Sequence, residues 1–242
     1  MRRLIYGLLL LVALPACATD APEFAAQRQK LVEWLALEVQ ESAPVTGVTA
    51  LDPRVVEAIG TVPRERFVPA PIRPFAYAPI PLPVHPEQNL TAPFLTALML
   101  TLVELQPGFV VFETGTDTGY GAALLSGLVD RVYSMELIPE LAEQAAATLA
   151  ELGARNVVVR EGDGYFGWPE HAPYDAIIIK EQVDHLPPQL LAQLKPGGRM
   201  VLPLGGGNDQ MLTLVEKRAD GRIIERRVLP VRFSPLQGGE RI

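Results

Sequence analysis

The chain has few of the residues that build disulfides and metal sites. Its 242 residues include one cysteine, Cys17, and three histidines, His85, His171 and His185. A single cysteine cannot close an internal disulfide, and no histidine has a second ligand at a spacing typical of metal sites. These absences argue against a disulfide scaffold, a dithiol redox centre and a metal site, and we expect no metal in the chemistry.

Positive charge is also scarce. Lysine and arginine number 21 against 28 aspartates and glutamates, which gives a formal net charge of −7. Binding to a phosphate backbone requires basic residues, so nucleic acid is not an expected partner. Hydrophobic residues make up 48% of the chain, which excludes disorder for the bulk of it and provides for one sizeable core.

The N-terminal apolar run, residues 4–14, is too short to span a membrane, which takes about 20 residues. It follows Arg2 and Arg3 and precedes small residues, the layout of a secretory signal over residues 1–18. We therefore expect an exported protein, in the periplasm or the cell envelope. If the segment is not a signal, the protein is cytoplasmic.

Two processing sites remain open at the end of this signal. The tripeptide Ala16-Cys17-Ala18 fits cleavage that releases a soluble chain. The tetrapeptide Leu14-Pro15-Ala16-Cys17 resembles a bacterial lipoprotein box, in which Cys17 would be lipidated and would attach the protein to a membrane.

Residues 19–92 predict a helical and proline-rich N-terminal extension. Apolar residues at three-and-four spacing indicate a helix over residues 23–39, and Asp52 before Pro53 indicates the capped start of a second. The many prolines of residues 63–86 exclude long regular structure there.

Residues 93–242 predict an α/β domain. A helix starts at position 92 or 93, with Thr91 as its expected cap, and runs to residue 105. Short hydrophobic strands then alternate with helices, which predicts a mostly parallel sheet, and two β-rich runs around Asp220-Gly221 predict an antiparallel C-terminal hairpin. The expected strands are residues 108–113, 132–136, 157–160, 174–179, 199–202, 211–217 and 223–231, and the expected helices between them are 120–129, 139–152 and 189–194.

A glycine-rich turn with Gly115 and Gly119 follows the first of these strands, which ends at Glu113. Glycines there let a ligand approach the backbone, and the start of the next helix offers free N–H groups. Glu136 ends the next strand, where a carboxylate can accept both hydroxyls of a ribose. Asp163-Gly164, after the third strand, can place a carboxylate near an adenine amino group.

Asp117, in the middle of the turn, indicates which nucleoside binds. A pyrophosphate would meet its charge, and two like charges at about 4 Å repel by roughly 1 to 4 kcal/mol. S-adenosylmethionine carries a sulfonium and an amine against one carboxylate and tolerates an acidic turn. We therefore expect S-adenosylmethionine as the cofactor rather than a nicotinamide or flavin dinucleotide.

Successive segments between about residues 27 and 238 resemble signatures of the protein-L-isoaspartate O-methyltransferase family. They are residues 52–59 (DPRVVEAI), 62–69 (VPRERFVP), 76–77 (AY), 81–83 (PLP), 113–120 (ETGTDTGY), 162–165 (GDGY), 167–169 (GWP), 174–178 (YDAII), 194–199 (LKPGGR) and 229–236 (LPVRFSPL). The resemblance implies a Rossmann-like class I methyltransferase. It also implies an enzyme that methylates the carboxylate of isoaspartyl residues in damaged proteins, a repair reaction. We expect a monomer.

This reaction needs little acid or base chemistry. A carboxyl with a pKa of about 4 is already ionised at neutral pH, so no general base is required. Catalysis then rests on holding the carboxylate oxygen and the methyl carbon in line at about 3 to 3.5 Å. A hydroxyl donor suits the carboxylate better than a tight arginine fork, which would stabilise the ground-state anion.

The resemblance assigns roles to individual residues. Thr91 aligns with the family's serine at the reacting carboxylate, and Glu113 would support the methionine portion of the donor. Gln88, Lys180 and Arg232 are candidate substrate contacts. Simpler interpretations stay open for four of them: Thr91 as a helix cap, Glu113 as a buried acid that stabilises the turn, Lys180 as a rim charge paired with Glu181, and Arg232 in a surface ion pair.

The chain departs from the family at three places around the site. Pro86 and Glu87 stiffen the loop before Thr91, Asp117 replaces a glycine, and residues 180–182 (KEQ) replace a run of small residues. These changes leave two alternatives open. One is a catalytically impaired exported protein that binds peptides or acidic ligands, and the other is a carboxyl methyltransferase with another substrate.

Overall fold

The computed structural model describes residues 22–86 and 88–238. The predicted signal sequence, Cys17 and Glu87 lie outside these residues. Among the described helices, none combines the length and the hydropathy that crossing a bilayer requires.

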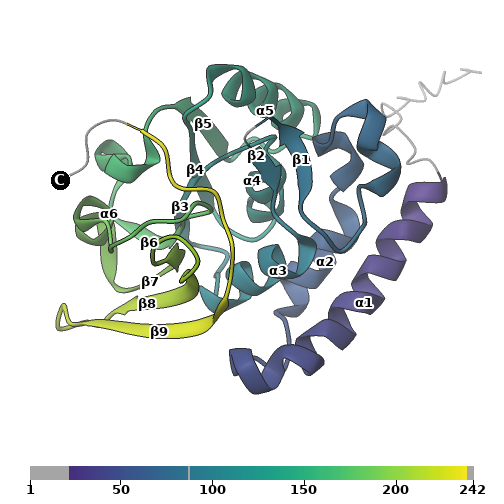
Figure 1. Ribbon diagram of the computed structural model, residues 1–242. Coiled ribbons are helices and arrows are strands. Elements are labelled where there is room, and N and C mark those ends of the chain that lie inside the picture. The colour runs from purple at the N-terminus through teal and green to yellow at the C-terminus, as the bar shows by residue number, and fades with distance from the viewer. Residues whose placement is uncertain (1–21, 87, 239–242) are drawn as a thin grey trace, which may run out of the picture.

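Seven strands form one sheet in the order β5-β4-β3-β6-β7-β8-β9 (Figure 1). The five strands from β3 to β7 run parallel, and β8 and β9 run antiparallel to their neighbours. The strands are β3 (Val110–Thr114), β4 (Arg131–Glu136), β5 (Val157–Glu161), β6 (Tyr174–Ile178), β7 (Leu194–Leu204), β8 (Met211–Lys217) and β9 (Ile223–Pro230). The predicted fold class and the C-terminal hairpin are confirmed.

Helices and a small hairpin complete the fold. The α-helices are α1 (Pro22–Thr46), α2 (Pro53–Thr61), α3 (Pro93–Leu102), α4 (Tyr120–Ser126), α5 (Pro139–Glu151) and α6 (Pro188–Gln193). Short 3-10 helices are η1 (Arg64–Phe67), η2 (Ala70–Phe75), η3 (Gly164–Phe166) and η4 (Pro169–His171). Strands β1 (Leu82–His85) and β2 (Gln88–Leu90) pair antiparallel, so the proline-rich passage contains only short elements, as predicted.

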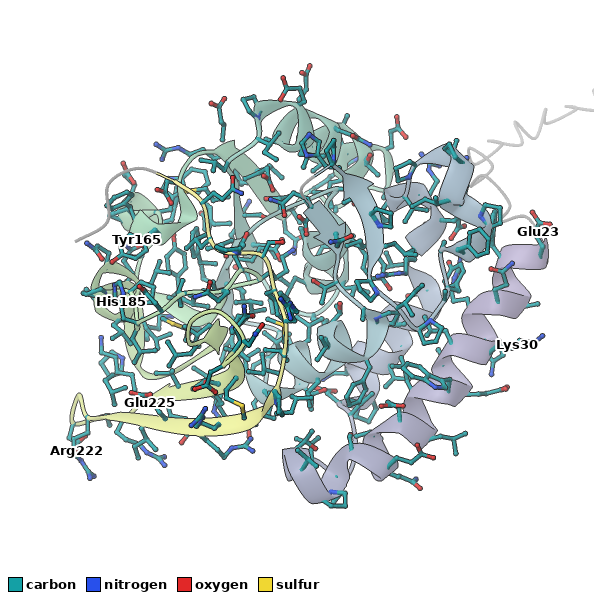
Figure 2. All side chains as sticks on the ribbon, in the orientation of Figure 1. Glu23, Lys30, Tyr165, His185, Arg222 and Glu225 are labelled. Atoms are coloured by element: carbon teal, nitrogen blue, oxygen red, sulfur yellow. The ribbon has the colours of Figure 1, made fainter. Side chains whose placement is uncertain are left out.

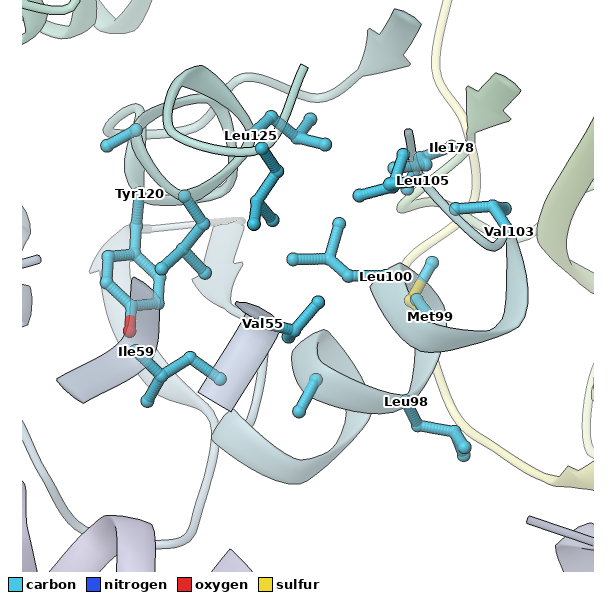
Figure 3. Close-up of a cluster of buried hydrophobic side chains, with 14 of the residues drawn as sticks. Val55, Ile59, Leu98, Met99, Leu100, Val103, Leu105, Tyr120, Leu125 and Ile178 are labelled. Carbon is cyan, nitrogen blue, oxygen red and sulfur yellow. The ribbon is translucent and has the colours of Figure 1, made fainter. Parts of the chain in front are cut away.

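Successive strand side chains point to opposite faces of the sheet, and both faces are buried at the central strands β3 and β6. In β3, Val111 packs with α1 to α4 on one face, whereas Phe112 packs with Tyr174 and the segments around α6 on the other. Figure 3 shows part of the first cluster, in which Val55 of α2 lies beside Leu100 of α3. The N-terminal extension therefore shares a core with the sheet.

Two helix starts test the capping predictions. Asp52 caps α2, and its carboxylate accepts a hydrogen bond from Arg54 N at 2.9 Å, which confirms that prediction. The prediction that Thr91 caps α3 is wrong, because Ala92 occupies that position and makes no side-chain cap. Pro93 is the first residue of α3 and has no N–H, so one fewer donor needs a cap.

Strand β7 is longer than the predicted 199–202. It starts at Leu194, which pairs with Tyr174 of β6, and it continues through Pro196, Gly197 and Gly198. Those three residues are typical of a turn in isolation. Leu194 pairs with Tyr174 and Arg199 pairs with Ala176, so the register shifts between them and the turn-like residues form an irregularity inside β7.

Candidate functional site

The candidate residues gather where parallel strands end. Glu113 lies near the end of β3, Glu136 closes β4, and Lys180 follows β6. These strands are adjacent and parallel in the sheet, so their carboxyl ends meet at one edge. The turn of residues 115–119 leaves β3 at the same edge, as the sequence predicts.

The turn keeps its shape despite the aspartate in its middle. Gly115, Asp117 and Gly119 have φ values of 59°, 52° and 97°. Aspartate is among the few residues that tolerate this left-handed region, so Asp117 can adopt a φ that usually favours glycine. A side chain at Gly119 would also press against Ala145 at 3.3 Å.

Glu136 anchors this turn to the end of β4. One carboxylate oxygen accepts a hydrogen bond from the Asp117 N–H at 2.8 Å, and the other accepts one from the Ile138 N–H at 3.0 Å. The side chain is only 3% exposed. Each carboxylate oxygen has a further lone pair, so Glu136 can still accept hydrogen bonds from a ligand.

Lys180 and Glu113 form an ion pair below the turn. Lys180 Nζ lies 3.3 Å from Glu113 Oε2, and the Ser134 hydroxyl donates to Glu113 Oε1 at 2.7 Å. The partner of Lys180 is therefore Glu113 of β3, not the adjacent glutamate of its own loop, and Lys180 is mostly buried rather than at the rim. The interpretation of Glu113 as a buried, turn-stabilising acid agrees with this contact.

Glu181 reaches over the first glycine of the turn. Its carboxylate lies directly above Gly115, in the space that a Cβ at that position would need. The Thr114 hydroxyl donates a hydrogen bond to Glu181 Oε2 at 2.5 Å. Burial raises the pKa of Glu181 to about 7, the Thr114 hydrogen bond and Lys180 oppose this, and Glu136 adds to it. Sequence reasoning identified position 181 as unusual but did not predict this contact.

Three carboxyl groups, Glu113, Asp117 and Glu181, act on the Lys180 ammonium, and Glu136 lies beside Asp117 and Glu181. Burial raises the pKa of Asp117 to about 8; Lys180 opposes this shift, and Glu181, Glu136 and Glu113 add to it. Burial disfavours the charge of Lys180, but the carboxylates of Glu113, Asp117 and Glu181 outweigh it and raise its pKa. Acidic side chains outnumber the lysine among these residues, so this edge of the sheet favours binding of a positively charged group.

The raised pKa of Asp117 makes stability depend on pH. A pKa raised above the ordinary value of 3.8 means that the folded protein favours the neutral carboxyl over the charged one. Its contribution to the free energy of unfolding is complete below about pH 3.8 and is lost as pH rises through about 8. Asp117→Asn cannot ionise and tolerates a positive φ. We expect its Tm to exceed that of the parent by at least about 3 °C at about pH 9, with the difference shrinking toward about pH 4.

Thermal unfolding across this pH range tests the Asp117 prediction. The exposed Asp130→Asn, directly before β4, is the control and is expected to show no such trend. A Tm difference for Asp117→Asn that stays constant with pH would contradict a buried carboxyl with a raised pKa.

One cavity of about 640 Å³ joins five predicted residues. Gln88, Thr91, Asp117, Lys180 and Arg232 all line it, although they come from β2, the start of α3, the turn, the β6 loop and the segment after β9. The structure thus brings residues predicted to contact the substrate, such as Thr91, into one cavity with Asp117 of the turn predicted to bind S-adenosylmethionine. Thr91 is 9% exposed.

A much smaller cavity of about 20 Å³ adjoins Glu136. Gly115, Glu136 and Gly164 line it, together with Glu181, which also borders the large cavity. This volume holds about one water molecule. Glu181 therefore lies between the two cavities, together with Gln88 and Pro235, which also line both.

Asp163 and Gly164 shape the backbone beside this small cavity. Asp163 accepts a hydrogen bond from Tyr165 N at 2.9 Å as the cap of η3, and Tyr165 in turn bonds His185 at 2.8 Å (Figure 2). Asp163 lines neither described cavity, and its contact with adenine stays a prediction. A Cβ on Gly164 would meet Thr114 Cγ2 at 2.6 Å, so glycine lets η3 pack against β3.

The C-terminal strap, residues 231–236, forms a wall of the large cavity. It is the yellow segment that leaves β9 and crosses in front of the sheet in Figure 1. Gln182 N donates to Ser234 O at 2.9 Å, and Gln210 accepts from Phe233 N at 2.8 Å. The sequence marked position 182 only as part of an altered run and did not mark Gln210, because the partners of both side chains and main chains lie on distant segments.

Comparison with known proteins agrees with the predicted family. Residues 41–241 match the family model described as protein-L-isoaspartate(D-aspartate) O-methyltransferase. A curated protein-L-isoaspartate O-methyltransferase 1 of Cupriavidus necator is 46% identical over 94% of this chain and 88% of its own. A protein-L-isoaspartate O-methyltransferase 2 of Syntrophobacter fumaroxidans is 48% identical over 92% of this chain and 90% of its own.

Solved structures agree with the fold. A structure named protein-L-isoaspartate O-methyltransferase superposes with a TM-score of 0.73 at 31% identity, over 87% of this chain and 66% of that chain. A Plasmodium falciparum structure described as a protein-L-isoaspartate O-methyltransferase superposes with a TM-score of 0.72 at 19% identity, over 88% and 98% of the two chains. The second likeness concerns the fold alone.

Proposed function

The chain belongs to the protein-L-isoaspartate(D-aspartate) O-methyltransferase family, and from this premise we propose that it methylates the carboxylate of isoaspartyl residues in damaged proteins with S-adenosylmethionine. The observation that carries the proposal is the single cavity that Thr91 and Asp117 both line. A carboxylate bound at Thr91 and a donor bound at the turn would therefore share one enclosed space.

The residues of the cavity suit a reaction that depends on positioning. The isoaspartyl carboxylate, with a pKa of about 4, is ionised without a base. The Thr91 hydroxyl can donate to it, and Gln88 and Arg232 offer further donors from other walls of the cavity. S-adenosylmethionine supplies, when bound, a methyl group on a sulfonium that the carboxylate can attack.

The chemistry of the strand tips fits this donor. Glu136 retains lone pairs for ribose hydroxyls, and the Glu113 carboxylate can complement the positive charge of a sulfonium or an ammonium. Asp117 and Glu181 have raised pKa values, and a bound cation would favour their ionised forms. The space beside Glu136 is too small for a nucleoside while Glu181 covers Gly115. Binding of the donor therefore requires the Glu181 side chain to move.

Glu136→Gln is expected to weaken binding of S-adenosylhomocysteine by about 10-fold. An amide supplies one oxygen in place of two, so either a backbone N–H of the turn or a ribose hydroxyl loses its acceptor. Calorimetric titration measures the change. Glu161→Gln is the matched control, since Glu161 pairs with Glu136 in register on β5 but is exposed. Equal affinities of Glu136→Gln and the parent would contradict a donor contact at Glu136.

Methyl transfer to a synthetic peptide tests the function. The protein is incubated with isotopically labelled S-adenosylmethionine and a peptide that contains one isoaspartyl residue, and the same peptide with an ordinary aspartate is the control. The proposal predicts label in the isoaspartyl peptide alone. Transfer no greater than to the aspartyl control would contradict it.

A second candidate function is a non-catalytic peptide-binding protein on the same scaffold. The position of the Glu181 carboxylate over Gly115 favours it, because this carboxylate fills the space of the donor. Titration with S-adenosylhomocysteine separates the two candidates, since micromolar binding would contradict the non-catalytic one. Donor binding without transfer to isoaspartyl peptide would favour a carboxyl methyltransferase with another substrate.

We also propose that the protein is exported. Residues 1–18 are then either cleaved to release a soluble chain, or the segment is processed at Cys17, which is lipidated. The support is the sequence pattern of arginines, apolar run and small residues. Mass spectrometry of the mature N-terminus tests this. A chain that begins at Thr19 indicates release, a lipid-modified Cys17 indicates membrane attachment, and an intact Met1 contradicts export.

A further inference from the structure

Arg64 of η1 is fully buried beside the candidate site. Its Nε donates to the Ala76 carbonyl at 2.9 Å, and its Nη2 donates to the Thr91 carbonyl at 2.9 Å. The centre of the guanidinium lies 4.7 Å from the centroid of the Tyr120 ring. A single side chain thus contacts three segments that are distant in the sequence.

Two of these contacts lie next to the two proposed ligand sites: Thr91 belongs to the site for the substrate carboxylate, and Tyr120 adjoins the turn of residues 115–119, the donor turn. Thr91 lies between the end of β2 and the start of α3, so neither element fixes its main chain fully. Tyr120 is the first residue of α4 and directly follows Gly119, the last residue of the donor turn. Arg64 therefore connects the main chain that carries the Thr91 hydroxyl with the structure that follows the donor turn.

A buried guanidinium at this place is costly and geometrically specific. Burial lowers the pKa of Arg64, although Tyr120 and Tyr77 oppose this effect. Apolar residues often stabilise a core as well as buried charges do, so stability alone does not explain an arginine here. The planar fork of arginine can reach two carbonyl oxygens and lie on a ring at the same time, which a lysine ammonium cannot do.

We propose that Arg64 is a positioning residue, which holds the main chain of Thr91 at a fixed place relative to the donor turn. The proposal rests on the proposed function for its kinetic consequence, because transfer from donor to carboxylate depends on the alignment of two sites. Its structural part, the placement of Thr91, is independent of that function.

Arg64→Lys keeps the charge and loses the fork. It is expected to lower kcat for methyl transfer by about 10-fold, while the KM for the peptide and the affinity for S-adenosylhomocysteine stay near the parent values. Arg64→Gln, which keeps an amide donor without the charge, is the second variant and should also lower kcat. A kcat equal to that of the parent in a folded variant would contradict the proposal.

A double-mutant cycle separates positioning from general stabilisation. If Arg64 acts through Thr91, Arg64→Lys should lower kcat much less in a Thr91→Ala background, because the hydroxyl that it places is already gone. An equal loss in both backgrounds would contradict the proposal. Arg28→Lys is the matched control, since Arg28 is also buried and bonds Tyr77 but makes none of the contacts to Thr91 described above.

NMR of methyl-labelled threonine gives a readout without activity. The Thr91 methyl signal, assigned with Thr91→Ser, is expected to shift or broaden in Arg64→Lys and to stay unchanged in Arg28→Lys. An unchanged signal in Arg64→Lys would overturn the proposal. A changed signal in a protein that transfers no methyl group would support the placement of Thr91 by Arg64 and would contradict only the proposed function.

Discussion

Replacement of Glu181 by alanine is expected to tighten binding of S-adenosylhomocysteine by about 10-fold to 100-fold. In the parent, the donor must displace a carboxylate that lies over Gly115 and accepts a hydrogen bond from Thr114. Breaking a hydrogen bond to a charged group opposes binding, and alanine removes both the bond and the obstruction. Calorimetric titration measures the change.

The pH dependence of the same titration tests the cause. The pKa of Glu181 is about 7 in the enclosed position, and a displaced carboxyl facing water returns to about 4.5. Parent affinity should therefore rise between about pH 5 and 7 and level off above, and Glu181→Ala should lose this part of the slope. Asp117, Glu113, Glu136 and Lys180 face the same space and remain in both proteins.

Asp184→Ala is the control for Glu181→Ala, because it removes an exposed carboxylate from the same loop. It should leave both the affinity and its pH dependence unchanged. Weaker binding by Glu181→Ala would contradict displacement and would identify Glu181 as a contact of the bound donor.

Thr91→Ala is expected to lower kcat for methylation of isoaspartyl peptide by about 100-fold, whereas Thr91→Ser should keep most of the activity. Alanine removes the hydroxyl that we propose binds the substrate carboxylate, and serine retains it. The affinity for S-adenosylhomocysteine should not change, because the donor contacts lie on the strand tips. Steady-state kinetics with the labelled donor measure the effect.

Thr96→Ala provides the comparison for Thr91→Ala. Thr96 is equally buried on the next turn of α3, and its hydroxyl bonds the Ala92 carbonyl. Its loss should lower the Tm without a comparable loss of kcat. Equal kcat losses in the two variants would show that the Thr91 effect comes from destabilised α3 rather than from a substrate contact.

Much of the fold follows from local patterns. The parallel strands are short hydrophobic runs between helices, and the Asp52 cap is encoded by the residues next to it, so both could be predicted. The start of β7 could not, because Leu194 pairs with Tyr174 of a distant strand ahead of an irregular Pro-Gly-Gly stretch. The prediction that Thr91 caps α3 was wrong. Threonine is favoured at helix starts and alanine is not, yet Ala92 occupies the cap position.

The site was predictable where topology alone brings residues together. Glu113, Glu136 and Lys180 follow adjacent parallel strands, so the sheet order decides that they meet. The partner of Lys180 was not predictable, because neighbours in sequence suggested Glu181 and the sheet supplied Glu113. Arg64 carried no chemical motif, and its contact with Thr91 depends on how η1 packs against the start of α3.

The departures from the family alter charge and volume more than backbone. Asp117 adopts the φ that a glycine would, so the turn persists, and Glu181 takes space above that turn. The position of Glu181 over Gly115 is consistent with an enzyme that binds its donor only after this side chain moves.

A crystal structure of the protein with S-adenosylhomocysteine and an isoaspartyl peptide tests the account most directly. We expect the ribose hydroxyls at Glu136, the Glu181 carboxylate moved away from Gly115, and the peptide carboxylate within hydrogen-bond distance of the Thr91 hydroxyl. Crystals grown with saturating ligands in which Glu181 still covers Gly115 and both ligands lie outside the cavity would contradict it.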